Sequence, residues 1–298
     1  MAFSTVLGLC HFIILMCILV FLSQDLEWHR ISLETVAGSR IPALTPWLLG
    51  CIRASCASVV WGVLLYVTFT RKPLFLTVAL RDGKKKLVSL LGLQRYAMFT
   101  VWCWTIQGFF FVVAGYCCFA KHFEGENSSV AAYFPTPPEI LVHSATILFE
   151  ISFPVSFVVS SLVTFVLIPH AKKAKMPIDN FFVFVPLVMH NVNIAFMAME
   201  LVINKIPFIP WHFPVILIYG MAYIVFSWVW NHCHGYYFYF FLDYTRTGAV
   251  LWYIALMIIV GIFFFVGLAS SMLMNSSTSI VPSLIIIALT SAVIKVSD

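Results

Sequence analysis

The sequence predicts an all-α protein that crosses a membrane several times. Hydrophobic residues make up 62% of the 298-residue chain, charged residues make up 10%, and the mean hydropathy is +0.99. Soluble domains carry about 25% charged residues, and a core of this size cannot hide so much apolar surface from water. The apolar residues also gather in runs of spanning length, which is about 20 helical residues. We therefore expect a polytopic transmembrane helix bundle of about eight spans.

Eight apolar runs are the candidate spans. The first follows no basic segment, and the "VFLSQD" at its end is a poor cleavage site, so we interpret it as an anchor and not as a signal peptide. The chain then divides into an N-terminal anchor helix and loop (1–46), a membrane core (47–274) and a short C-terminal membrane helix (275–298). The eight runs, of which the last is the shortest, are 4–22, 47–70, 96–120, 140–168, 181–203, 213–241, 249–274 and 280–294.

The basic residues predict the orientation. Loops rich in Lys and Arg face the cytosol, and two loops are rich in them, whereas the loop after the third run is acidic. With eight spans, both termini are then cytosolic, in the endoplasmic reticulum or the plasma membrane. Sequons at Asn127 and Asn275 fall on the opposite side, where glycosylation occurs. The basic residues of the two loops are Arg71, Lys72, Arg81, Lys84, Lys85, Lys86 and Arg95, and Lys172, Lys173 and Lys175.

Charge and cysteine usage argue against several classes of function. The net charge of +5 belongs to loops and no basic domain exists, so we expect no nucleic-acid partner. The cysteines lie in or beside apolar runs, where they act as small hydrophobic residues. The segment "WNHCHGYYFYFFLD" (230–243) contains metal-ligand types, but its spacing matches no closed zinc site. We therefore predict no metal and no cofactor.

Polar residues at membrane depth mark the candidate site, because ionisable groups inside a bilayer are costly and usually functional. In "MHNVNIAFMAMEL" (189–201), His190, Asn193, Met197 and Glu200 are spaced three or four apart. On a helix they share one face, and we expect that face to look into the bundle.

The depth of these residues predicts which of them meet. His190 and His232 each lie about nine residues from the cytosolic ends of their runs, or roughly 14 Å at 1.5 Å per residue. Thr100 lies about four residues into the third run, so it can meet them there, together with the amides of Asn191, Asn193 and Asn231. Near the opposite end we expect an ion pair between Arg53 and Glu200. Glu150 has no assigned partner, and His143 and His212 are taken as interfacial.

Four stretches resemble the androgen-induced-gene family of integral-membrane hydrolases. "FTVWCWTIQGFFF" (99–111) resembles that family's threonine-bearing helix, and "SFPVSFVVS" (152–160) resembles the helix after it. "MHNVNIAFMAMEL" is similar to its Met-His helix, and "NHCHGYYFYFFLD" (231–243) to its Gly-aromatic-Tyr-Pro-Phe-Leu-acid segment. The related rolling stone proteins share the His-x-x-Asn pattern of His190 and Asn193. The resemblance covers residues 47–274 and implies a six-helix core.

The resemblance implies a hydrolase of lipid esters, acting on fatty acid esters of hydroxy fatty acids. It implies Thr100 as the nucleophile and His190 as the base that activates it. Asn193, Asn231 and His232 are candidates to bind the substrate by donating hydrogen bonds to the oxyanion. The substrate would come from the bilayer. The chain departs from the family at Asn191, Asn193 and Ala195, at Phe240 in place of a proline, and in its additional eighth run.

Two other classes of function remain open. The protein can be a non-enzymatic membrane protein, either a structural or accessory subunit of a larger membrane complex with protein partners, or a receptor-like factor. A small transporter has less support, because the sequence contains no internal repeat and no pair of broken helices. Labelling of Thr100 by a serine/threonine-directed probe would distinguish the enzyme from both.

Overall fold

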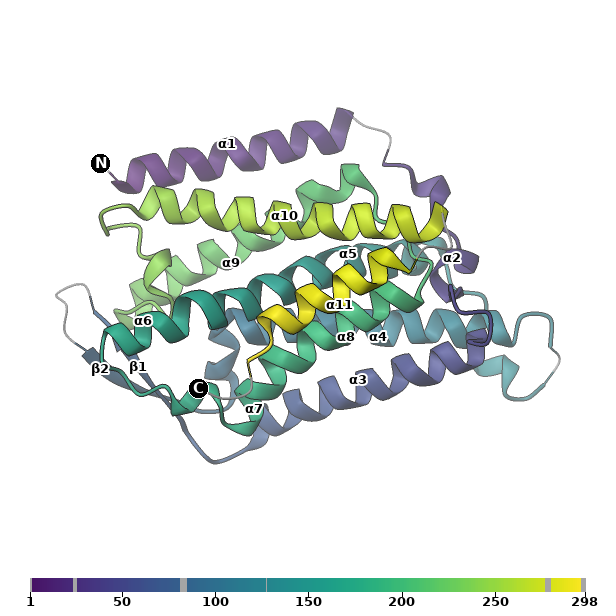
Figure 1. Cartoon of the computed structure of the whole chain (residues 1–298), viewed down its shortest axis with the longest axis horizontal. Helices are drawn as coiled ribbons and strands as arrows, with labels where there is room; N and C mark the ends of the chain where they lie inside the picture. The colour runs from purple at the N-terminus through teal and green to yellow at the C-terminus, as the bar shows by residue number, and fades with distance from the viewer. Residues whose placement is uncertain (1, 24–25, 81–84, 127, 277–279, 296–298) are drawn as a thin grey trace.

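The protein is a multi-pass bundle of membrane helices. The computed structural model describes residues 2–23, 26–80, 85–126, 128–276 and 280–295, and its long helices run nearly along one axis (Figure 1). Within this part of the chain, six helical segments are long and apolar enough to cross a membrane. They are α3 (Pro46–Phe69), α4 (Phe99–His122), Glu139–Lys173, Phe184–Ile203, Pro210–His234 and α10 (Ala249–Ser276).

Three of these segments are not uniform α-helices. Glu139–Lys173 consists of α5 (Glu139–Leu162), a π-helical turn (Val163–Leu167) and α6 (Ile168–Lys173). Phe184–Ile203 consists of α7 (Phe184–Leu187), a π-helical turn (Val188–Val192) and α8 (Asn193–Ile203). The fifth segment ends in α9 (Phe213–His234). Such π-turns occur frequently at functional sites.

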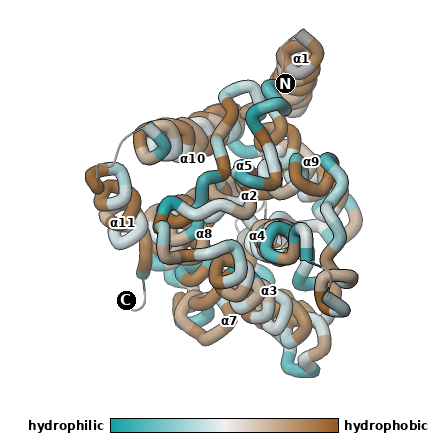
Figure 2. Tube along the Cα trace, turned by 90° about the vertical axis from the view of Figure 1, so that its right-hand side faces the viewer, coloured by the Kyte–Doolittle hydropathy of each residue, from teal (hydrophilic) through white to brown (hydrophobic). Residues whose placement is uncertain are grey.

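The first and last apolar runs form helices at the margin of the bundle. In α1 (Ala2–Ser23) the apolar stretch is Ser4–Val20, and α11 (Val281–Val293) has 13 residues; both fall below the length of a span. End on, α1 and α11 lie outside the central α4, α5 and α8 (Figure 2). A short helix, α2 (Leu33–Ala37), begins with a capping box in which Ser32 and Thr35 exchange hydrogen bonds.

A small β-hairpin was not expected from the sequence. Strands β1 (Leu74–Ala79) and β2 (Lys85–Leu90) pair antiparallel, with Leu74 opposite Leu90. Val78 and Val88 pack on Tyr236, in the segment after α9. The basic loop that follows α3 is therefore a folded element lying against the rest of the molecule.

The close contact of α3 and α4 depends on small residues. A Cβ atom on Gly108 would lie 2.9 Å from Val60 Cγ1 and 3.2 Å from two atoms of the Trp61 indole. Small residues let membrane helices approach closely, so glycine at this crossing sets the distance between the two helices.

The sequence prediction was wrong about the end of α9. The apolar run 213–241 was expected to be one helix, but α9 ends at His234, and Gly235 takes a left-handed conformation with φ +80°. Glycine commonly ends a helix in this way. The aromatic residues that follow leave the helix, and His232 lies exposed in the last helical turn instead of deep in the membrane.

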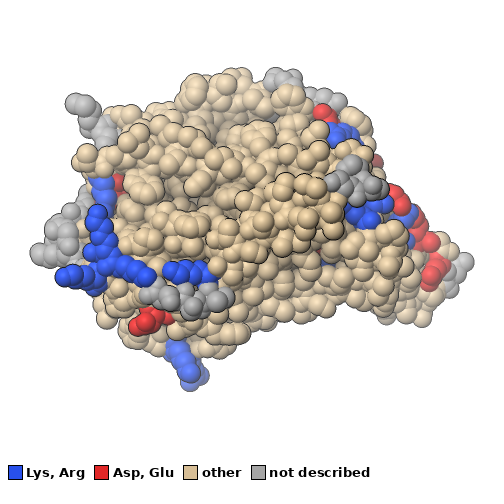
Figure 3. All heavy atoms as spheres, viewed as in Figure 1, with Lys and Arg blue, Asp and Glu red and all other residues tan. Residues whose placement is uncertain are grey.

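Charged side chains are concentrated at the two ends of the bundle. On the face shown in Figure 3, a belt without charged side chains separates a mostly basic group of residues at one end from acidic and basic residues at the other. The basic group is at the end that carries the hairpin (Figures 1 and 3). Asn127 lies outside the described residues. Asn275 lies near the end of α10, where its side-chain oxygen accepts a hydrogen bond from Arg40 Nε at 3.1 Å.

Candidate functional site

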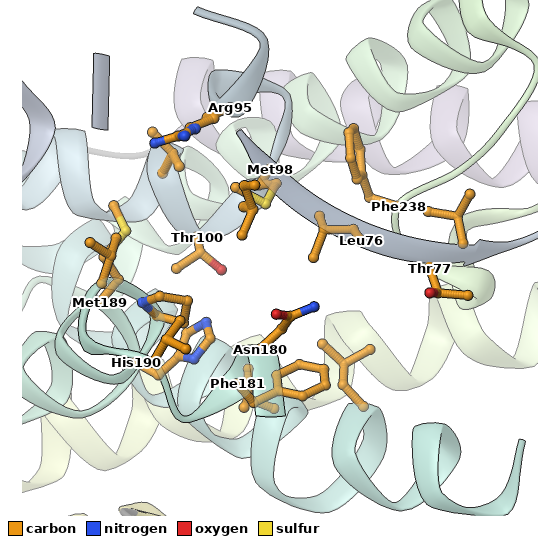
Figure 4. A pocket seen from close by; sticks show the side chains of 18 of the residues that line it. Leu76, Thr77, Arg95, Met98, Thr100, Asn180, Phe181, Met189, His190 and Phe238 are labelled. Carbon is orange, nitrogen blue, oxygen red and sulfur yellow. The ribbon is translucent and has the colours of Figure 1, made fainter. Parts of the chain in front are cut away.

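A cavity of about 400 Å³ lies at the basic end of the bundle (Figure 4). It is enclosed by the end of α3, β1, the start of α4, both π-turns and the segment after α9. Most of its wall is apolar, including Leu76, Met98 and Met189, and a few polar side chains reach it. This combination is typical of a site for a small apolar ligand. The polar, titratable or hydroxyl-bearing residues of the wall are Tyr66, Thr70, Lys72, Thr77, Arg95, Thr100, His170, Asn180, His190, Tyr237 and Tyr239.

Thr100 is the second residue of α4 and lines this cavity. Threonines deeper in helices donate their hydroxyl to the preceding turn, as Thr105 does to Val101 O at 2.8 Å and Thr68 to Leu64 O at 2.7 Å. Because α4 begins at Phe99, Thr100 has no preceding turn of α4 to bond. Figure 4 shows its hydroxyl directed into the cavity.

Tyr239 is the polar neighbour of Thr100. Burial raises the pKa of Tyr239 to about 12, while hydrogen bonding to the Thr100 hydroxyl and to the backbone N–H groups of Thr100 and Phe99 lowers it. The phenol is therefore protonated at neutral pH. Those N–H groups belong to the first turn of α4, where they have no partner within the helix, so Tyr239 and the start of α4 bring several donors to one place.

His190 lines the same cavity, although it is distant from Thr100 in the sequence. It lies in the π-turn Val188–Val192. Its backbone carbonyl accepts a hydrogen bond from the Ser160 hydroxyl of α5. Its Nδ1 is enclosed and has no hydrogen-bond partner among the described residues. The ring is partly exposed toward the cavity, so Nε2 is the nitrogen left to act there. Figure 4 shows Thr100 and His190 along one wall.

The end of α11 fastens both π-turns. Asn191, beside His190, donates from Nδ2 to Lys295 O at 2.8 Å and accepts from Lys295 N at 3.3 Å. Thr164, in the other π-turn, donates to Val293 O at 2.8 Å. The eighth apolar run, which has no counterpart in the resemblance, thus contacts the elements that carry the site.

The three predicted substrate-binding residues lie away from the cavity wall. Asn193 is 1% exposed, and its carbonyl accepts a hydrogen bond from Gln107 Nε2 at 3.0 Å. Asn231 and His232 lie in the last turn of α9. None of the three is among the described residues that line the cavity. His232 was expected about nine residues inside its helix, but α9 ends at His234, so His232 lies in the last helical turn and does not join His190 at the cavity wall.

Sequence reasoning missed two residues of the wall. Tyr239 was hidden in a run taken as helix, and the signal that would have revealed it is Gly235, a helix-ending residue four positions earlier. Arg95 was counted only as a loop charge. The signal for Arg95 is its isolation in the apolar stretch "LLGLQRYAMF" (90–99), which suggests a buried cation.

The far end of the bundle holds two buried pairs. The predicted ion pair is confirmed: Arg53 Nε donates to Glu200 Oε1 at 3.0 Å, Nη2 contacts the same oxygen, and both side chains are buried. The interpretation of Glu150 and His212 was wrong. His212 is 1% exposed, and its Nδ1 lies 2.6 Å from Glu150 Oε2. The run of Pro and Phe before α9 carries His212 into the bundle, where Ile209 N also donates to Glu150.

The predicted polar face of the Met-His helix is confirmed at its three buried members. Asn193 is 1% exposed, and Met197 and Glu200 are fully buried, so none of them faces lipid. Together, the fold and the cavity define a multi-pass helical membrane protein with an internal site at its basic end. No protein-family model, curated protein or solved structure matches this chain. The resemblance to the androgen-induced-gene family therefore stays a prediction from the quoted residues.

Proposed function

We propose that this protein is an integral-membrane hydrolase of lipid esters, with Thr100 as nucleophile and His190 as general base. The observation that carries the proposal is that these two residues, which lie far apart in the sequence, line one largely apolar cavity. A threonine hydroxyl needs a neighbouring base to become a nucleophile, and a neutral imidazole serves as that base.

The proposed reaction has two stages. His190 takes the proton of Thr100 as its oxygen attacks the ester carbonyl, and it then returns a proton to the leaving alcohol. Water, activated by the same imidazole, hydrolyses the acyl-threonine. Tyr239 is the donor that we assign to the oxyanion. It takes the role that the sequence suggested for Asn193, Asn231 and His232.

The substrate class that we propose is a fatty acid ester of a hydroxy fatty acid. The apolar wall suits acyl chains, and Phe184, which lines the cavity, is 72% exposed, so the cavity reaches the surface there. A lipid can therefore approach from the membrane.

The orientation belongs to the same proposal. We assign the basic end, and with it the cavity, to the cytosol. We also propose that α1 and α11 complete eight passes or partial passes, which places both termini on the cytosolic side of the endoplasmic reticulum or plasma membrane.

Hydrolysis by the purified protein in lipid nanodiscs tests the proposal. Thr100→Ala and His190→Ala should each lower ester turnover by about 1,000-fold or more, and the double variant should be hardly worse, because the two residues act as a unit. Thr100→Ser should keep part of the activity. Thr105→Ala is the matched control, since its hydroxyl is bonded to Val101 O. Full turnover by Thr100→Ala would show that Thr100 is not the nucleophile, and no turnover by the wild-type chain would favour the alternative, a non-enzymatic membrane protein.

A further inference from the structure

The cavity wall carries positive charge and no negative charge. Among the described residues that line it, Lys72 and Arg95 are the charged ones, and none is Asp or Glu. His170 adds a further titratable base. A largely apolar cavity with cations on its wall is complementary to an amphiphile that ends in an anion.

Arg95 is the buried member of this pair of cations. It is 6% exposed and precedes α4, outside the spans. Its guanidinium donates from Nε to Leu90 O at 3.4 Å and from Nη1 to Val67 O at 3.1 Å, and Nη2 donates to Lys72 O. A guanidinium has five N–H groups, so two remain beyond these three bonds, with the group held in place by backbone carbonyls.

The comparison with Arg53 shows what Arg95 lacks. Both arginines are buried, but Arg53 bonds the carboxylate of Glu200. In the described part of the chain, Arg95 contacts carbonyls and no carboxylate. Burial lowers the pKa of Arg95, partly offset by Tyr66, yet an arginine stays charged in proteins. A buried charge is normally paired, so an anion is the missing partner.

We propose that Arg95, assisted by Lys72, binds the anionic group of the lipid whose acyl chain fills the cavity. This inference rests on the proposed function and adds the feature that selects the substrate: an ester that also carries a carboxylate or a phosphate. Arginine binds either group through paired N–H···O hydrogen bonds. The carboxylate would be a free acid end of the substrate, and the phosphate would be a phospholipid headgroup.

A binding experiment separates this inference from the catalytic one. It uses the full-length Thr100→Ala chain in nanodiscs of neutral lipid, so that no turnover is needed. Quenching of tryptophan fluorescence reports the binding of three bromine-labelled probes: an 18-carbon fatty acid, its methyl ester, and the corresponding lysophosphatidic acid. The chain should bind at least one anionic probe more tightly than the methyl ester. The ligand group is a carboxylate if the loss of Arg95 weakens binding of the fatty acid more, and a phosphate if it weakens binding of the lysophosphatidic acid more.

The variants test the role of each cation. Arg95→Gln should weaken binding of the anionic probe by about tenfold and leave the methyl ester unchanged. Lys72 is exposed, and Lys72→Gln should weaken binding of the anionic probe by a smaller factor. Lys173→Gln removes the same charge from a residue outside the cavity wall and is the control. If Arg95→Gln does not fold, Arg95→Lys, which keeps the charge and loses the paired geometry, takes its place. The inference is overturned if the wild-type and Arg95 variant chains show the same ratio of affinities for the anionic probes and the methyl ester. This holds whatever the hydrolysis assay shows.

Discussion

Thr100 has an ordinary side chain in an unusual position. Threonines are common in membrane helices because their hydroxyls bond to the turn before them, as Thr105 and Thr68 do. At the second position of α4 this partner is missing, and the hydroxyl is left to the cavity and to Tyr239. The hydroxyl of Thr100 thus differs from those of Thr105 and Thr68 because α4 begins only one residue before Thr100.

Tyr239→Phe tests the donor that we assign to the oxyanion. The change removes the hydroxyl and keeps the ring, so we expect kcat to fall by about 100-fold with little change in KM or in thermal stability. Tyr236→Phe, on the same segment but outside the cavity wall, should keep its activity. Steady-state kinetics of both variants in nanodiscs provide the measurement, and an unchanged kcat in Tyr239→Phe would remove this residue from the mechanism.

At the scale of elements, the sequence predicted the helices well because hydropathy alone determines which segments enter a membrane. It predicted neither the hairpin nor the end of α9. The hairpin is short and basic, and its strands are stabilised by contact with Tyr236, which is distant in the sequence. The end of α9 depends on the backbone of Gly235 and not on hydropathy, which continues to Phe241. For the same reason, Thr100 and His190 line the cavity as expected, whereas His232, placed by hydropathy alone, does not.

The π-turn that carries His190 gives a prediction about α11. Asn191→Ala removes both hydrogen bonds to Lys295, so the turn is less firmly held and the imidazole less well positioned. We expect kcat to fall by about tenfold to 100-fold, with the helix content unchanged. Ser291→Ala on α11 is the control, because that hydroxyl bonds only to Ile287 O within its own helix. Equal rates in both variants would show that α11 does not position the base.

The crossing of α3 and α4 gives a prediction about stability. Gly108→Ala places a methyl group 2.9 Å from Val60 Cγ1, and overpacking of this kind costs about 1–3 kcal/mol. Gly62→Ala on α3 meets nothing within 4 Å and should be neutral or slightly stabilising, since alanine favours helix. Thermal unfolding in detergent compares the two. If Gly108→Ala unfolds at no lower temperature than Gly62→Ala, the contact at Gly108 does not set the distance between α3 and α4.

At the scale of the whole molecule, the distribution of charge and the cavity define one functional end. The hairpin and the last turn of α9 lie together there (Figure 1), and the cavity is lined by β1 and by the segment after α9. The buried Arg53–Glu200 pair joins the first half of α3 to the end of α8 instead. The orientation that we propose places this basic end in the cytosol.

Cys233 tests that orientation directly. It is the exposed cysteine of the described chain and lies in the last turn of α9. A membrane-impermeant maleimide should label it only after the cells are permeabilised, and Cys233→Ser should abolish that labelling. Labelling in intact cells would reverse the assigned orientation and place the cavity on the outside.

The buried pair of Arg53 and Glu200 also constrains how the protein is made. Its two members are 147 residues apart in the chain, so a ribosome working at about 5–20 residues per second needs roughly 7–30 s to supply the second after the first. During that interval α3 carries an arginine that has no acid to neutralise it. We therefore expect the first half of the protein to stay incompletely assembled until α8 emerges. Chain termination between these residues should leave a fragment that quality-control factors recognise by its unpaired positive charge.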